Sequence, residues 1–163
     1  MSLGLLTKPS NGAELDHMVE FREGVELLKN EYADKALVKL RRAFESDNRN
    51  PYYISFLGLA TARAEQQWEQ ALELCESAVQ LKRKEIKFHL NLAQVCALAG
   101  LRERAMHTLD EASKLFGDDK RLKRARSKVV NRRAPMLPFL RRDHFLNREL
   151  GKLRHRLLDR LDE

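Results

Sequence analysis

The chain has little of what stabilises small secreted domains. Its 163 residues include two cysteines, seven glycines, four prolines and one tryptophan. Cys75 and Cys96 do not have the spacing of a CxxC site, so a reducing, cytoplasmic compartment is expected. With so few glycines and prolines, long stretches are rich in Ala, Leu, Glu, Lys and Arg, and this composition favours an all-α protein.

Long apolar runs are also missing. No window approaches the roughly 18 apolar residues that a membrane span needs. The first residues, MSLGLLTKPSNG, lack the basic and apolar regions of a secretory signal, and we expect residues 1–12 to form a flexible leader. Hydrophobic residues make up 43% of the chain and charged residues 34%, which is typical of a folded domain.

Motifs for catalysis are absent as well. The sequence has no Gly-rich phosphate loop, no HExxH and no nucleophile elbow. Its five histidines are scattered, whereas a metal site needs three or four converging ligands. We therefore predict no enzymatic activity, no cofactor and no metal site. Cys75 and Cys96 fall inside helical patterns, and we interpret both as small buried hydrophobic residues.

What the chain does contain is a repeat with a period of 34 or 35 residues. Four columns show this period: Ala36, Ala71 and Ala105; Ala43, Ala78 and Ala112; Leu40, Cys75 and Leu109; and Gly24, Gly58 and Ala93. Each unit is predicted to form two helices, the first ending near Asn30, Glu65 and Gly100. Small side chains recur where the two helices cross, because they let backbones approach to roughly 8 Å.

The helix boundaries carry their own signals. Asn50-Pro51 is typical of an N-cap followed by proline at the first helical position. Gly100 and Gly117 are predicted to end helices, and Asp118 is predicted to cap the next one. The second unit has one extra residue, which we place in the turn between its two helices.

These residues resemble the tetratricopeptide repeat. The second unit matches that pattern with Ile54, Leu57, Gly58, Ala71 and Cys75, and the third with Leu92, Ala93, Ala105 and Leu109. The resemblance implies a right-handed superhelix of antiparallel helix pairs, with repeats at about 14–49, 50–84 and 85–117. A narrow apolar stripe over residues 118–133 predicts a capping helix, so the folded part spans residues 13–133.

In this family the first helix of each repeat lines a concave groove. The resemblance therefore implies a peptide-binding groove formed by Met18, Phe21, Val25, Tyr52, Phe56, Leu59, Arg63, Lys87, Leu90, Asn91 and Gln94. Much of this set is apolar, and a large exposed apolar surface is typical of a binding site. The alternative is that some of these side chains simply pack between helices. One class of these repeats grips a terminal carboxylate with five polar residues, but only Lys87 matches that class here.

The basic residues are concentrated at the end of the chain. Residues 1–119 contain 16 Lys and Arg against 19 Asp and Glu, whereas residues 120–163 contain 15 against 5, a net charge of +10. The capping helix alone carries a basic patch of Lys120, Arg121, Lys123, Arg124, Arg126 and Lys128. This patch could be a solvated face, which we favour, or a contact for an acidic protein. Nucleic acid and anionic membrane are further alternatives.

A proline-flanked apolar segment, residues 134–143, comes after the capping helix. Its large side chains are Met136, Leu137, Phe139 and Leu140, and proline holds such a segment extended. We predict that it acts as a built-in ligand, either on its own groove or on that of a second chain. An amphipathic helix is expected over 144–163, and residues 134–161 could form a homodimer.

The sequence thus predicts a non-enzymatic scaffold that binds a protein or peptide partner through an extended apolar segment. One alternative is a small chaperone of the kind used in bacterial type III secretion. The other is an adaptor for nucleic acid or membrane that works through the basic tail.

Overall fold

Seven α-helices follow one another in the computed structural model, which describes residues 11–131. They are α1 (Asn11–Lys29), α2 (Ala33–Ser46), α3 (Pro51–Ala64), α4 (Trp68–Leu81), α5 (Ile86–Leu98), α6 (Arg102–Phe116) and α7 (Lys120–Asn131). No strand occurs within these residues, so the described part of the chain is all-α, as predicted. The predicted segments 134–143 and 144–163 lie outside the described residues. So does most of the predicted leader, although its last two positions belong to α1.

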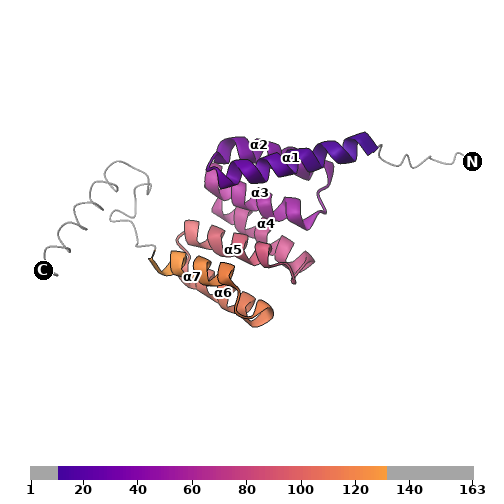
Figure 1. Ribbon diagram of the computed structural model, residues 1–163. Coiled ribbons are helices and arrows are strands. Elements are labelled where there is room, and N and C mark those ends of the chain that lie inside the picture. Colours follow the sequence, from indigo (N-terminus) through magenta and orange to yellow (C-terminus); the bar gives the residue numbers. More distant parts are fainter. Residues whose placement is uncertain (1–10, 132–163) are drawn as a thin grey trace, which may run out of the picture. The chain divides into compact units, whose positions relative to one another are not determined.

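The helices form pairs that stack in chain order (Figure 1). Three-residue turns connect α1 to α2, α3 to α4 and α5 to α6, and the two helices of each pair contact each other. The first helices of the pairs lie side by side, because α3 contacts both α1 and α5. This arrangement confirms the predicted repeat: one pair per period, with α7 following the third pair.

The small residues of the repeat lie in the core. All six alanines of the two alanine columns are completely buried, as are Leu40 and Cys75. A methyl group added at Gly24 would lie 2.6 Å from Cγ of Leu40, and one added at Gly58 would lie 2.8 Å from Sγ of Cys75. The absence of a side chain is therefore what lets α1 approach α2, and α3 approach α4, this closely.

The predicted helix signals are confirmed at three of four positions. The Asn50 side chain accepts a hydrogen bond from the backbone N–H of Tyr52 at 3.1 Å, as an N-cap should. Gly100 and Gly117 follow helix ends with φ of +83° and +66°, in the left-handed region that glycine enters without strain.

The fourth signal was wrong by one residue. Asp119, not Asp118, caps α7, since its side chain accepts from the backbone N–H of Arg121 at 2.7 Å. Asp118 forms an ion pair with Lys123 at 2.6 Å instead. The chain leaves α6 through the left-handed Gly117, and this turn displaces the start of α7 by one position.

The extra residue of the second repeat was also misplaced. Each turn between paired helices contains one residue with positive φ, namely Glu31, Gln66 and Gly100. Each of these residues precedes the next buried alanine by five positions, so the three turns have equal length. The extra residue therefore lies in the last turn of α3, because Gly58 precedes Gln66 by eight positions whereas Gly24 precedes Glu31 by seven.

Candidate functional site

The neighbouring helices α1, α3 and α5 each carry half-buried apolar side chains. Phe21 and Val25 come from α1, Phe56 from α3 and Leu90 from α5. All four pack against the core while keeping part of their surface exposed. We call these four residues the inner-helix face. They belong to the set that the family resemblance predicts to line a groove.

Aromatic rings of the inner-helix face join the first two repeats. The ring of Phe21 lies 4.8 Å from that of Tyr53 and 5.5 Å from that of Phe56, the latter edge to face. Tyr53 is buried, and its hydroxyl lies 3.0 Å from Nδ1 of His17. Such ring pairs add about 0.5–1.5 kcal/mol each beyond the area they bury, so Phe21 and Phe56 have fixed positions before any ligand arrives.

Two residues of the predicted groove are not accessible. Leu59 is 5% exposed and lies in the core. Asn91 is 8% exposed, and its amide donates to Oγ of the buried Ser55 at 3.0 Å. Because α3 is packed between α1 and α5, these side chains join neighbouring helices rather than facing outward. For Leu59 and Asn91, the alternative interpretation is therefore correct: they pack between helices.

The other predicted groove residues remain at least partly accessible. Met18 is 45% exposed, Lys87 is exposed and Gln94 is half-buried. Arg63 is half-buried and donates to the backbone carbonyl of Leu28 at 2.8 Å, close to the C-terminal end of α1. Burial lowers the pKa of this guanidinium. Arg63 thus connects the first two repeats, a role that its position in the repeat did not reveal.

Tyr52, at the start of α3, connects the second and third repeats. Its hydroxyl donates to Oε2 of Glu85 at 2.6 Å, and Nζ of Lys82 donates to the same hydroxyl at 3.2 Å. Because it accepts the Tyr52 hydrogen bond, the Glu85 carboxylate has a lowered pKa. Sequence reasoning included Tyr52 as a groove residue and missed Glu85, which precedes α5 and accepts from the backbone of Lys87.

These positions do not form a carboxylate clamp. The five clamp positions hold Phe21, Val25, Phe56, Lys87 and Asn91, and the two phenylalanines are packed ring against ring. The amide of Asn91 is already hydrogen-bonded to Ser55. Lys87 is left as a single exposed cation, which cannot replace several converging donors.

The two thiols and one histidine, His89, are in packed surroundings. Cys75 and Cys96 are both completely buried, and burial raises the pKa of each thiol. His89 is buried, and its Nε2 donates to the backbone carbonyl of Arg83 at 2.9 Å. Within the described residues, no three His, Cys, Asp or Glu side chains gather as a metal site would require.

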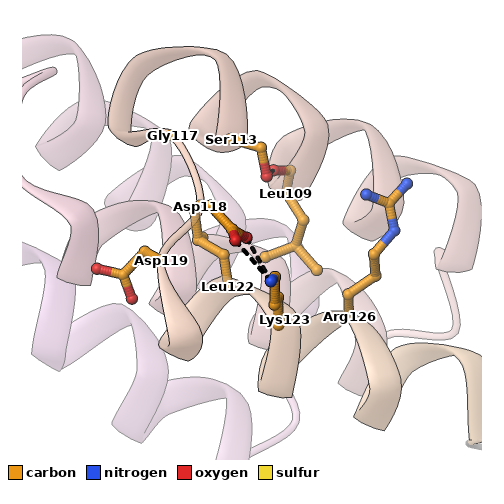
Figure 2. A pocket seen from close by; sticks show the side chains of 8 residues that line it. All are labelled: Leu109, Ser113, Gly117, Asp118, Asp119, Leu122, Lys123 and Arg126. Carbon is orange, nitrogen blue, oxygen red and sulfur yellow. Dashed lines mark hydrogen bonds and ion pairs between the residues drawn. The ribbon is translucent and has the colours of Figure 1, made fainter.

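The basic patch lies on α7, whose side facing the core is apolar. Leu122 and Val129 are 3% and 6% exposed and belong to the core. A pocket of ≈ 330 Å³ lies between α6 and the start of α7 (Figure 2). Its lining residues are Leu109, Ser113, Gly117, Asp118, Asp119, Leu122, Lys123 and Arg126. The charged residues on its wall are paired with each other or with Asp110 and Arg121, so the pocket offers no uncompensated charge to a ligand.

Over residues 11–131, no helix is both long enough and apolar enough to cross a membrane. The two helices with few charged residues, α3 and α5, have 14 and 13 residues, fewer than a membrane span needs.

Known proteins share this arrangement of repeated helix pairs. The family model of the tetratricopeptide repeat matches residues 62–129. No curated protein sequence matches the chain. Solved structures do match, and three examples, each 18% or 19% identical, are tetratricopeptide repeat domains.

The first is the Arabidopsis OM64 domain, with a TM-score of 0.60, covering 73% of this chain and 98% of that one. The Sgt2 domain from Aspergillus fumigatus has a TM-score of 0.59 and covers 86% and 95%. The second domain of human RPAP3, in complex with an HSP70 peptide, also has a TM-score of 0.59 and covers 74% and 100%.

At these identities the solved structures establish the fold alone, and the family model adds the sequence pattern. Both agree with the stacked helix pairs and the buried alanine columns described above. The chain therefore has the fold of tetratricopeptide repeat domains, and its residues 62–129 match the family model of that repeat.

Proposed function

We propose that the protein is a non-enzymatic adaptor that binds an apolar peptide segment on its inner-helix face. The observation that carries this proposal is that three helices in mutual contact each carry half-buried apolar side chains. Their accessible parts can still be covered by a ligand, and each large apolar side chain that becomes fully buried is worth about 1.5–3 kcal/mol. A few such anchors are enough for micromolar affinity.

The similar domains support a peptide as the ligand. The second domain of RPAP3 is in complex with an HSP70 peptide, and the first domain of Spaghetti is bound to an HSP90 peptide. The present chain differs from a carboxylate clamp at Phe21, Val25 and Phe56. We therefore infer that its ligand is recognised by apolar side chains and not by a terminal carboxylate.

Two matched variants test the proposal. Val25→Asp with Leu90→Asp places two charges among half-buried residues of the inner-helix face. Val38→Asp with Leu81→Asp makes the same chemical changes at side chains that are 51% and 59% exposed on α2 and α4. Peptides selected from a displayed library on the wild type, then synthesised and labelled, provide the ligands for fluorescence anisotropy.

The first variant should lose at least about tenfold in affinity, because burying an unpaired carboxylate is costly. The second variant should bind like the wild type. Circular dichroism must show the same helical content in all three proteins. Equal affinity of the wild type and the first variant would contradict the proposal, as would equal losses in both variants.

We further propose that the apolar segment around residues 136–140 occupies this face, in the same chain or in a second copy. Deleting residues 134–163 should then expose the face, so that the selected peptides bind more tightly and a hydrophobic dye becomes more fluorescent. A synthetic peptide of residues 134–142 should reverse both effects. If deletion changes neither, the segment is a linker between α7 and residues 144–163.

A further inference from the structure

The six basic residues of α7 divide into two sets of three. Arg121 pairs with Asp119 at 2.8 Å, Lys123 with Asp118 at 2.6 Å and Arg126 with Asp110 at 2.7 Å. Figure 2 shows Lys123 directed toward Asp118 at the start of the helix. These three cations are therefore neutralised by carboxylates of the chain itself.

The second set consists of Lys120, Arg124 and Lys128, which we call the outer stripe. All three are exposed, and they form no ion pair with any residue of the chain that the structure describes. They are spaced at intervals of four residues, so they share one side of the helix over about 12 Å. At 100° per residue, this side points away from the buried Leu122 and Val129.

We propose that the outer stripe binds the phosphate backbone of double-stranded nucleic acid, independently of sequence. Phosphate binding is driven by release of counterions, and it needs cations in a row but no apolar anchor. The outer stripe meets this description. Lys and Arg form it alone, while the large apolar residues between positions 120 and 129 are buried.

Other polyanionic partners fit less well. A protein that docked here would gain mainly exposed ion pairs, which contribute little to affinity, because Val130 is the one large apolar side chain that α7 exposes. A single strand would find no aromatic residue for stacking, since α7 contains none. A membrane would have to attract α7 without insertion of Leu122 and Val129, because these side chains already pack in the core.

A charge-matched pair of variants of the full chain tests this proposal. One variant is Lys120→Gln, Arg124→Gln and Lys128→Gln. The control is Arg22→Gln, Lys35→Gln and Arg49→Gln, which removes three exposed cations of the first repeat that also lack ion pairs among the described residues. Both lower the net charge equally. The measurement is the affinity for a mixed-sequence DNA duplex as a function of salt concentration.

The outer-stripe variant should lower the slope of log K against log salt by about 3, since each phosphate contact contributes about 0.9. The control should keep the wild-type slope. Lys120→Arg with Lys128→Arg, which preserves the charge, should bind like the wild type. Equal losses in both glutamine variants would overturn the proposal. So would tighter binding of poly-glutamate, of a single strand or of anionic vesicles than of the duplex.

Discussion

At the scale of the residue, Gly58 is surrounded on all sides. A methyl group there would lie 2.8 Å from Sγ of Cys75, 2.9 Å from the backbone oxygen of Ala71 and 3.0 Å from Cβ of Leu74. The Ala71 oxygen belongs to the backbone, so it cannot move away by a change of side-chain rotamer. Since protein interiors are close-packed, α3 and α4 would have to separate.

We expect Gly58→Ala to destabilise the fold by about 1–2 kcal/mol. Overpacking costs about 1–3 kcal/mol, and the better helix propensity of alanine offsets up to about 1 kcal/mol of it. Urea denaturation measures the difference. In a Cys75→Ala background the loss should be smaller, because the closest atom is gone. A stabilised Gly58→Ala protein would show that the two helices are not in close contact here.

At the scale of the element, each turn between paired helices contains one residue with positive φ, but the type of that residue differs among the three turns. Gly100 enters it without strain, but Glu31 and Gln66 have φ of +66° and +56° although they carry a Cβ atom. A non-glycine residue in this region costs of the order of 1–2 kcal/mol. The first two turns are therefore less favourable than the third.

Gln66→Gly should relieve this strain and stabilise the protein by about 0.5–1 kcal/mol, after allowing for the larger entropy of glycine in the unfolded chain. Gln67→Gly is the matched control, because Gln67 has φ of −80° and its side chain makes no capping hydrogen bond. The control should be neutral or destabilising. Thermal unfolding of the two variants checks this, and a lower Tm for Gln66→Gly would contradict it.

At the scale of the whole molecule, neighbouring repeats are joined by a few polar contacts beside the apolar core. Arg63 joins the first repeat to the second through the Leu28 carbonyl, and Tyr52 joins the second to the third through Glu85. In a repeat stack, stability is the sum of the repeats and of their nearest-neighbour interfaces. A change at one of these contacts should therefore weaken one junction.

The Tyr52 junction should depend on pH. Because the Tyr52 hydroxyl donates to it, Glu85 has a lower pKa in the folded protein than in the unfolded chain. Its contribution is complete above the unfolded pKa of about 4.3, and it is lost as the pH falls through the folded pKa. Tyr52→Phe should cost roughly 1 kcal/mol at pH 7, and this cost should shrink toward pH 3.

Urea denaturation at both pH values measures the effect. Tyr32→Phe is the control, because the Tyr32 side chain is 58% exposed, and it should cause little change at either pH. A cost of Tyr52→Phe that stays constant between pH 7 and pH 3 would show that the Glu85 carboxylate is not the partner that matters.

The period of the alanine columns was enough to predict every helix pair within a few residues. A 34-residue spacing of small residues has one simple physical cause, the crossing of paired helices. The position of Asp119, and of the extra residue in α3, depends on the path of each turn, which short-range signals do not determine. Leu59 was assigned to the groove from its position in the repeat, but it is buried in the core, on a helix that packs between α1 and α5.

The sequence pattern also could not show which cations of α7 form ion pairs in the folded protein. A count of lysines and arginines treats all six alike, whereas three of them meet Asp110, Asp118 or Asp119 in the fold. Asp110 is 16 residues away from its partner Arg126, on the preceding helix. Asp118 and Asp119 lie in the turn before α7, and only the Arg126–Asp110 pair depends on the packing of α7 on α6.

The two buried thiols give the protein a reporter of its own opening. Cys75 lies in α4 and Cys96 in α5, on either side of the junction between the second and third repeats, and the sequence has no other cysteine. A thiol reagent added to the folded protein can react only when the packing around these sulfur atoms opens, since burial protects both of them. The rate of thiol labelling therefore measures local opening at the middle of the stack, and it does not report fraying of the first helix.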